Sequence, residues 1–239
     1  MRLNRFLSSR GVGARRKCDE MIRQGRVKMN GHTVMEPGVQ VEIGRDTIDV
    51  DGNVIETTVR LVYVLLHKPA GYVVTVRDPQ NRPTVFDLMD GISQRIFPVG
   101  RLDLDVGGLL LLTNDGNMSY RLIHPRYEVE KIYTLLVRGR PNSKALRAIE
   151  SGIQLEDGLT APTEVRILDN GEKITLLEMK MHEGRKRQIK RMWSAVGHPV
   201  VSLTRTAFAG LTIDDLRPGE WRFLRDDEVM WLKMNVGLS

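Results

Sequence analysis

Two amphipathic patterns open the chain and predict two short helices followed by a small sheet. Apolar side chains recur three and four positions apart in residues 3–7 and again in residues 18–22, on either side of a glycine-containing turn. This spacing gathers them on one face of a helix. Apolar positions then alternate around Asn30-Gly31, a strong hairpin signal, and over residues 39–43. Residues 1–52 therefore form one predicted unit.

The remainder of the chain mixes strand-type runs with helical patterns in no strict strand-helix-strand order. The predicted strands cover residues 61–66, 72–76, 109–113, 132–137 and 174–181. The predicted helices cover residues 118–123, 144–149 and 188–196. This arrangement favours the α+β class with a mixed, mostly antiparallel sheet. The expected organisation is a small α/β domain at 1–52, a polar linker at 53–60 and a larger domain at 61–239.

Composition and cysteine content narrow the class of protein. Of the 239 residues, 41% are hydrophobic and 28% are charged, as in globular proteins. No apolar run approaches the roughly 18–20 residues of a membrane-spanning helix, and no signal-peptide pattern follows Met1, so we expect a cytoplasmic protein with no membrane partner. The single cysteine, Cys18, excludes an internal disulfide and a zinc site built from several cysteines.

Positive charge is concentrated at the N-terminus. The chain has 36 Lys and Arg against 30 Asp and Glu, a net charge of +6. Residues 1–28 contain nine basic and two acidic residues, whereas the rest contains 27 basic and 28 acidic residues. A basic head on a nearly neutral body favours contact with a polyanion, although a basic helix face that meets only water has the same composition. Arg16 and Arg23 lie opposite the apolar face of the second predicted helix.

The N-terminal pattern resembles the S4 RNA-binding domain. Its anchors are Arg2-Leu3, Leu7, Gly11, Arg15-Arg16, Met21-Ile22, Gly25, Val27 and Asn30-Gly31. The departures are Asn4, Ala14 and Cys18, and Ala14 replaces the usual serine N-cap at a cost of about 1 kcal/mol of helix stability. The resemblance implies that exposed basic side chains bind RNA phosphates. We assign this role to Arg15, Arg16, Arg23 and Lys28.

An acidic loop directly before a strongly apolar run is the first candidate catalytic site. Residues 97–108 place Arg101 and Asp103 between glycines. The glycines allow sharp turns that present a carboxylate at a strand end. Two other interpretations stay open: an Arg101–Asp103 ion pair in an ordinary turn, and a metal site of Asp103 and Asp105, which has no third acidic ligand nearby.

A basic cluster at the start of a predicted helix is the second candidate. Five of the seven residues 185–191 are Lys or Arg, and a helical apolar pattern follows them. Together with the basic N-terminus, this favours phosphate binding over a solvated helix face. Lys131 and Tyr133 share one face of a predicted strand, where the tyrosine ring either packs in the core or lies against a nucleobase beside a cation.

Taken in order, these motifs resemble one branch of the ribosomal RNA pseudouridine synthases, which comprises type A for the small ribosomal RNA together with types B, E and F for the large one. The matching segments are Lys68-Pro69-Ala70-Gly71, Gly100-Arg101-Leu102-Asp103, Gly108 to Gly116, Glu130-Lys131-x-Tyr133 and Glu183 to Met192. The resemblance implies that Asp103 is the catalytic aspartate, Tyr133 the active-site tyrosine, and Lys190 the cation that pairs with Asp103. It further implies RNA contacts by Arg101, Arg185, Lys186, Arg187, Arg191 and Lys68.

The family departures are Val106 for Thr or Ser, Gly107 for a polar residue and His67 for Asn, which change the hydrogen-bonding groups near Asp103. The implied reaction breaks the N1–C1′ bond of a flipped-out uridine and rejoins the base through C5, with no metal and no cofactor. Residues 78–88 look most like type B of that branch. We therefore expect a monomer that acts on 23S ribosomal RNA, with 16S ribosomal RNA as the alternative substrate. A non-catalytic S4-type RNA-binding or ribosome-assembly factor is the alternative from another class.

Overall fold

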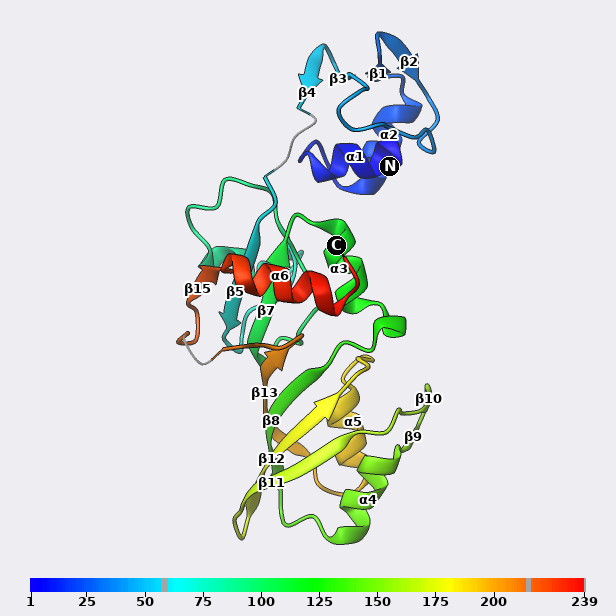
Figure 1. Cartoon of the computed structure of the whole chain (residues 1–239). Helices are drawn as coiled ribbons and strands as arrows, with labels where there is room; N and C mark the ends of the chain where they lie inside the picture. The colour runs from blue at the N-terminus through cyan, green and yellow to red at the C-terminus, as the bar shows by residue number, and fades with distance from the viewer. Residues whose placement is uncertain (57–59, 214–215, 239) are drawn as a thin grey trace. The chain divides into compact units, whose positions relative to one another are not determined.

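The computed structural model describes residues 1–56, 60–213 and 216–238, which form two compact units (Figure 1). Unit 1 comprises residues 1–62 with segments 92–96 and 114–116, and unit 2 comprises the remainder. Within the predicted linker, residues 53–55 form strand β4 (Asn53–Ile55), while residues 57–59 lie outside the described residues.

In unit 1, two helices bury their apolar faces together with one small antiparallel sheet. The helices are α1 (Leu3–Ser9) and α2 (Arg15–Arg23), and the strands are β1 (Val27–Met29), β2 (His32–Val34), β3 (Ile48–Val50) and β4, in the order β2-β1-β3-β4. The strand expected at 39–43 is wrong. Leu3 N donates to Val39 O (2.8 Å) and Val41 N donates to Met1 O (2.7 Å), so that segment forms an isolated bridge to the N-terminus.

Unit 2 is built on a nine-stranded sheet with the main order β11-β12-β8-β13-β7-β5-β15. The strands are β5 (Tyr63–Lys68), β6 (Phe97–Pro98), β7 (Gly107–Thr113), β8 (Lys131–Arg138), β11 (Glu164–Asn170), β12 (Ile174–Met181), β13 (Val200–Phe208), β14 (Leu211–Thr212) and β15 (Trp221–Phe223). A separate pair is formed by β9 (Gln154–Leu155) and β10 (Gly158–Leu159). Among the described strands only β7 and β13 pair in parallel, which confirms a mixed, mostly antiparallel α+β fold.

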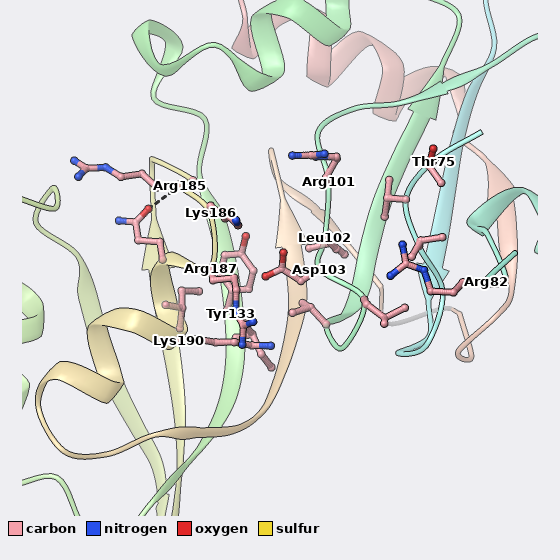
Figure 2. Close-up of a pocket in the computed structure, with 18 of the residues that line it drawn as sticks. Thr75, Arg82, Arg101, Leu102, Asp103, Tyr133, Arg185, Lys186, Arg187 and Lys190 are labelled. Carbon is pink, nitrogen blue, oxygen red and sulfur yellow. Dashed lines mark hydrogen bonds between the residues drawn. The ribbon is translucent and has the colours of Figure 1, made fainter. Parts of the chain in front are cut away.

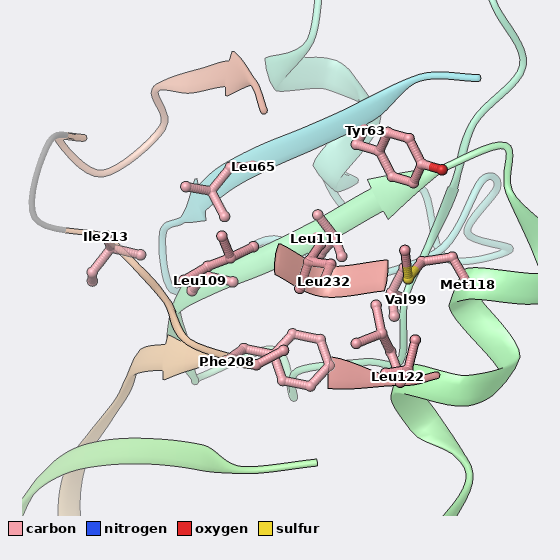
Figure 3. Packing of buried hydrophobic residues seen from close by; sticks show 13 residues of the cluster. Tyr63, Leu65, Val99, Leu109, Leu111, Met118, Leu122, Phe208, Ile213 and Leu232 are labelled. Atoms are coloured by element: carbon pink, nitrogen blue, oxygen red, sulfur yellow. The ribbon is translucent and has the colours of Figure 1, made fainter. Parts of the chain in front are cut away.

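Four helices and two 3-10 turns complete unit 2. They are η1 (Val85–Leu88), α3 (Gly116–Ile123), η2 (Pro125–Tyr127), α4 (Ser143–Ser151), α5 (Gln188–Ala195) and α6 (Asp226–Asn235). Figure 3 shows Leu109 and Leu111 of β7 packed with Leu122 of α3, Phe208 of β13 and Leu232 of α6. The core therefore includes β7, the strand that follows the acidic loop. Within the described residues, no helix is long and apolar enough to cross a bilayer.

One predicted strand of unit 2 is a loop. Residues 72–76 alternate like a strand, but only Val73 pairs, in an isolated bridge with Thr84. The chain between these two residues turns back on itself, so the segment faces a pocket and does not join the sheet. Several elements of unit 2 have no counterpart among the predicted ones, and the longest of these are β13 and α6.

Candidate active site

The end of β5 and the segment before β7 together shape the acidic loop. Lys68, the last residue of β5, is fully buried, and its Nζ donates to the carbonyl oxygen of Val106 at 2.7 Å. The same ammonium lies 3.0 Å from the carbonyl oxygen of Pro69, 3.2 Å from that of Asp103 and 3.4 Å from that of Leu104. A buried ammonium requires such acceptors, because burial without them is costly. The loop backbone is therefore wrapped around one cation.

The RNA contact expected of Lys68 is wrong, because this side chain has no exposed surface. Burial lowers the pKa of Lys68 to about 8, and the charges of Asp105 and Asp103 act in the opposite direction. The two departures next to the loop, Val106 and Gly107, both lie against Lys68. Val106 is buried, and a Cβ at Gly107 would lie 3.3 Å from the Lys68 carbonyl oxygen.

The loop ends where two strands approach closely. Gly108 has a φ of +107°, and a Cβ there would lie 2.2 Å from the carbonyl oxygen of Arg205 on β13. Only glycine accommodates both the left-handed backbone and the contact. Arg205 is buried, its Nε donates to the Leu109 carbonyl oxygen at 2.8 Å, and its guanidinium lies over the Phe208 ring. The parallel pairing of β7 with β13 thus begins directly after the acidic loop.

A pocket of about 600 Å³ opens beside this loop. Asp103 from the loop, Tyr133 from β8 and Lys190 from α5 line it, so the structure brings the three predicted catalytic residues together. Figure 2 shows the Asp103 carboxylate directed toward the Tyr133 side chain. The volume is in the range of pockets that hold small ligands, and a nucleoside is of that size. Asp103 is exposed, so a bound substrate is needed to exclude water from its carboxylate.

The predicted pairing of Lys190 is wrong in one respect. Its Nζ lies 2.5 Å from the Asp105 carboxylate, two positions beyond Asp103. The hydrogen bond from Lys190 lowers the pKa of Asp105, against the effect of burial, and the charges of Lys190 and Arg187 add to the lowering. In the described parts of the chain no cation lies within ion-pair distance of Asp103. The loop therefore presents two carboxylates. That of Asp105 is engaged in an ion pair with Lys190, and that of Asp103 is not.

Some side chains of the basic cluster, residues 185–191, form hydrogen bonds within the protein, and others do not. Arg185 donates to carbonyl oxygens of residues 157–159 at 2.6–3.2 Å and pairs with Glu183. Arg191 donates to both carboxylate oxygens of Asp157 at 2.9 Å and is not among the pocket residues. These two arginines were expected to contact RNA. The structure conflicts with that expectation, because their N–H groups donate to acceptors within the protein. Lys186 and Arg187 are exposed and line the pocket.

The segment before α5 has a fixed shape. The Glu183 carboxylate accepts from the Ala161 amide (2.9 Å) and from the Gln188 side-chain amide, and the Gln188 Oε1 accepts from the Arg185 amide (2.9 Å). Arg187 has a φ of +50°, a conformation that costs energy in a residue with a side chain. The hydrogen bonds of Glu183 and Gln188 hold that conformation, which places Arg187 at the pocket.

Lys131 does not line the pocket beside Tyr133. Its side chain instead binds the backbone next to the segment before α5. Its Nζ donates to the carbonyl oxygens of Val129 (2.7 Å) and His182 (3.2 Å). Burial lowers the pKa of Lys131 to about 8, and the positive charge of Arg205 adds to the lowering. The cation predicted to accompany the tyrosine ring therefore binds the backbone that leads into the basic cluster.

Unit 1 carries the predicted basic face. Its side chains Arg15, Arg16, Arg23 and Lys28 are all exposed, whereas Cys18, Met21 and Ile22 of α2 are buried. Ala14 occupies the N-cap position of α2 and makes no side-chain capping bond. The four basic side chains are therefore free to meet a polyanion.

Comparisons with known proteins place this geometry in a family. Residues 62–195 match the RNA pseudouridylate synthase family, and residues 1–47 match the S4 domain. The chain belongs to the RNA pseudouridylate synthase family. It is 44% identical over 240 residues to an uncharacterized RNA pseudouridine synthase of Aquifex aeolicus, covering 100% of this chain and 96% of that one. It is 43% identical over 234 residues to the ribosomal large subunit pseudouridine synthase B of Bacillus subtilis, covering 97% and 95%.

A solved pseudouridylate synthase crystal structure has the same architecture as this synthase. The TM-score is 0.70 at 31% sequence identity, and the match covers 97% of this chain and 99% of the other. The resemblances of the N-terminal unit and of the larger unit are therefore both confirmed. The ion pair bears on the metal-site alternative, because the Asp105 carboxylate is already bound to the Lys190 ammonium.

The synthase pocket has a wall that the motifs did not reveal. It is formed by Val73, Val74, Thr75, Arg77, Asp78, Pro79 and Arg82. Residues 72–76 have a strand-like pattern, so the sequence did not indicate that they form a loop. The sequence signal for this loop is the run Asp78-Pro79-Gln80-Asn81-Arg82-Pro83, because Asp, Asn and Pro are typical of turns.

Proposed function

We propose that this synthase isomerises one uridine of the large ribosomal RNA to pseudouridine, with Asp103 as the catalytic carboxylate. The observation that carries the proposal is the Asp103 carboxylate, which lines a nucleoside-sized pocket and is directed toward Tyr133. The name of the Bacillus subtilis relative supports the choice of the large ribosomal RNA. We further infer that the protein acts in the cytoplasm, because ribosomal RNA is its proposed substrate, and we propose that it acts as a monomer.

The reaction exchanges one glycosidic bond for another. The N1–C1′ bond breaks, the detached uracil turns, C5 bonds to C1′, and the proton on C5 leaves while N1 gains a proton. Asp103 acts either as a nucleophile toward the sugar or the base, or as the base that assists proton removal. The net change needs no oxidant and no energy donor.

The other pocket residues act on the detached uracil and on the RNA backbone. The Tyr133 ring stacks on the base while no bond holds it to the sugar. Lys186, Arg187 and Arg101 all line the pocket, and they bind phosphates or bases of the RNA strand from which the uridine is flipped out. The S4 unit adds affinity through Arg15, Arg16, Arg23 and Lys28.

The test compares transcripts and variants. Wild-type protein, Asp103→Asn and the control Asp169→Asn, an exposed aspartate of β11, are incubated with 23S and 16S ribosomal RNA transcripts. Pseudouridine is then mapped chemically. We expect one modified uridine in 23S RNA with the wild type and the control, and none with Asp103→Asn.

Each other outcome rejects a part of the proposal. Modification by Asp103→Asn removes the catalytic role of that carboxylate. Modification confined to 16S RNA overturns the substrate. RNA binding by the wild type without modification of either transcript, or of isolated ribosomal precursors, supports a non-catalytic RNA-binding factor.

A further inference from the structure

The loop between Val73 and Thr84 closes on itself and forms one wall of the Asp103 pocket. Val73 N donates to the Pro83 carbonyl oxygen at 2.9 Å, and Val85 N donates to the Val73 carbonyl oxygen at 3.0 Å. The Thr75 hydroxyl donates to the Arg77 carbonyl oxygen at 2.9 Å. These bonds fix both the ends and the middle of the loop.

Asp78 organises the far half of this loop. Its side chain is only 4% exposed, and its carboxylate accepts from Arg82 Nε (3.0 Å) and Arg82 Nη2 (2.7 Å). The backbone amides of Gln80 (3.1 Å) and Arg82 (3.0 Å) also donate to it. The side-chain bond from Arg82 is the largest cause that lowers the pKa of Asp78 to about 2. The carboxylate is therefore charged at neutral pH and neutralised by Arg82.

Two arginines of the loop keep donors that the protein does not use. Arg82 engages Asp78 through Nε and Nη2, its side chain remains 42% exposed, and in the described chain its Nη1 has no partner. Arg77 is exposed and lacks an acidic partner among the described residues. Because Asp78 is already neutralised, the loop presents a net positive charge to the pocket.

Arg82 lies across the pocket from the basic cluster, and Arg77 lines the pocket from the same loop as Arg82. In Figure 2, Arg82 is on one side of Asp103, and Lys186, Arg187 and Lys190 are on the other. A strand that delivers one nucleotide into a pocket continues on both sides of it, with a phosphate on each. A positive wall on each side matches this arrangement of charge.

We propose that Arg77 and Arg82 bind RNA phosphodiester groups on the side of the pocket opposite Lys186 and Arg187, with Asp78 as the positioning residue for Arg82. The ligand class is the RNA backbone, so the contacts contribute affinity without reading a base. A planar guanidinium held on one edge by a carboxylate offers its free edge to a phosphate in a fixed direction. This proposal rests on the proposed function for the entry of the target uridine at Asp103.

The test measures binding and turnover separately. Binding is measured by fluorescence anisotropy with a fluorescein-labelled fragment of the modified transcript, in the inactive Asp103→Asn background and over a series of salt concentrations. The variants are Arg77→Ala, Arg82→Ala and Asp78→Asn. The matched control is Arg166→Ala, an exposed arginine of β11 outside the pocket.

We expect Arg77→Ala and Arg82→Ala each to weaken binding about tenfold and to reduce the slope of log affinity against log salt by about 0.7 to 0.9. In otherwise wild-type protein, KM rises by a similar factor and kcat stays constant. Asp78→Asn removes the carboxylate charge that holds Arg82. We expect KM to rise, because the Arg82 guanidinium is then no longer directed at the phosphate. Arg77 makes no side-chain bond within the described chain, so Arg77→Ala leaves the melting temperature unchanged and separates binding from folding.

The proposal is overturned if Arg77→Ala and Arg82→Ala match Arg166→Ala in affinity and salt slope. A loss of kcat at constant KM also overturns it, because the loop would then act on the chemical step. If the wild type modifies no transcript, the proposed function fails. The anisotropy series, run with a uridine-rich single-stranded RNA, then still decides whether the two arginines bind phosphate.

Discussion

Lys190 and Asp105 form a 2.5 Å ion pair, so the cation that the motifs assign to Asp103 is held by the neighbouring carboxylate of the same loop. The Lys190 side chain is 15% exposed, whereas that of Asp105 is 65% exposed. The ammonium is thus the more buried partner and the carboxylate the more exposed one. Asp103 is left without an ion-pair partner in the described chain, and its carboxylate is free to approach a substrate.

The first prediction concerns this pair. Lys190→Gln removes the hydrogen bond that contributes most to the low pKa of Asp105, so that pKa should rise toward the ordinary aspartate value. Carbon-13 NMR titration of the Asp105 carboxyl measures it. Lys186→Gln, which removes an exposed positive charge of the same segment, is the control and should shift the titration much less. Equal shifts in both variants would show that the overall field, and not the pair, lowers the pKa.

The second prediction concerns the contact between β7 and β13. Gly108→Ala places a Cβ 2.2 Å from the Arg205 carbonyl oxygen and 2.5 Å from its amide nitrogen, at a φ of +107°. We expect the free energy of unfolding to fall by more than about 3 kcal/mol. Urea denaturation measures the change. The control is Gly184→Ala, where a Cβ meets no atom within 4 Å. A loss below about 1 kcal/mol for Gly108→Ala would mean that the strands can separate at little cost.

The third prediction concerns pH and Lys131. The folded-state pKa is lowered to about 8 from the ordinary 10.5, so the unfolded chain binds more protons between these values. The free energy of unfolding contributed by Lys131 therefore rises from about pH 8 to 10.5 and is lost as the pH falls through 8. Urea denaturation at several pH values should show wild-type stability increasing relative to Lys131→Met over this window. Parallel curves for the two proteins would contradict the lowered pKa.

The fourth prediction concerns the S4 unit. Arg16→Glu combined with Arg23→Glu reverses two exposed charges of α2 and should weaken RNA binding and flatten its salt dependence. The melting temperature should stay constant because neither side chain is buried. The matched control combines Arg147→Glu and Arg166→Glu, exposed arginines of unit 2 outside the pocket. An unchanged salt slope in the α2 variant would mean that these arginines meet only water.

The local sequence pattern was sufficient to predict those features that depend on contacts within one helix, hairpin or strand. The apolar face of α2, the hairpin at Asn30-Gly31 and the apolar run of β7 all have periodicities that the structure confirms. The acidic loop was predictable because glycines, Arg101 and Asp103 lie close together in the sequence. Pattern failed for β13, because the buried Arg205 interrupts its apolar alternation and is stabilised by contacts from distant strands.

Roles that depend on long-range contacts were not predictable. Lys68 looks like a surface cation in the sequence and becomes a buried one because four carbonyl oxygens surround it. Asp103 and Asp105 are equivalent partners for Lys190 by spacing, and only the fold of the loop selects Asp105. Residues 72–76 have strand-like alternation, yet Asp78 and Arg82 hold the chain in a closed loop.

The parallel contact between β7 and β13 consists, in the described sheet, of the two residue pairs Thr204–Gly107 and Arg205–Gly108. β7 follows Asp103, while β13 is paired along most of its length with β8, which carries Tyr133. The two residues that face the substrate thus belong to different halves of the sheet, joined by a narrow seam. The alignment of the carboxylate with the ring therefore depends on this seam and on the packing of Phe208 against β7 beside it, and a shift of β13 relative to β7 would move the ring relative to the carboxylate.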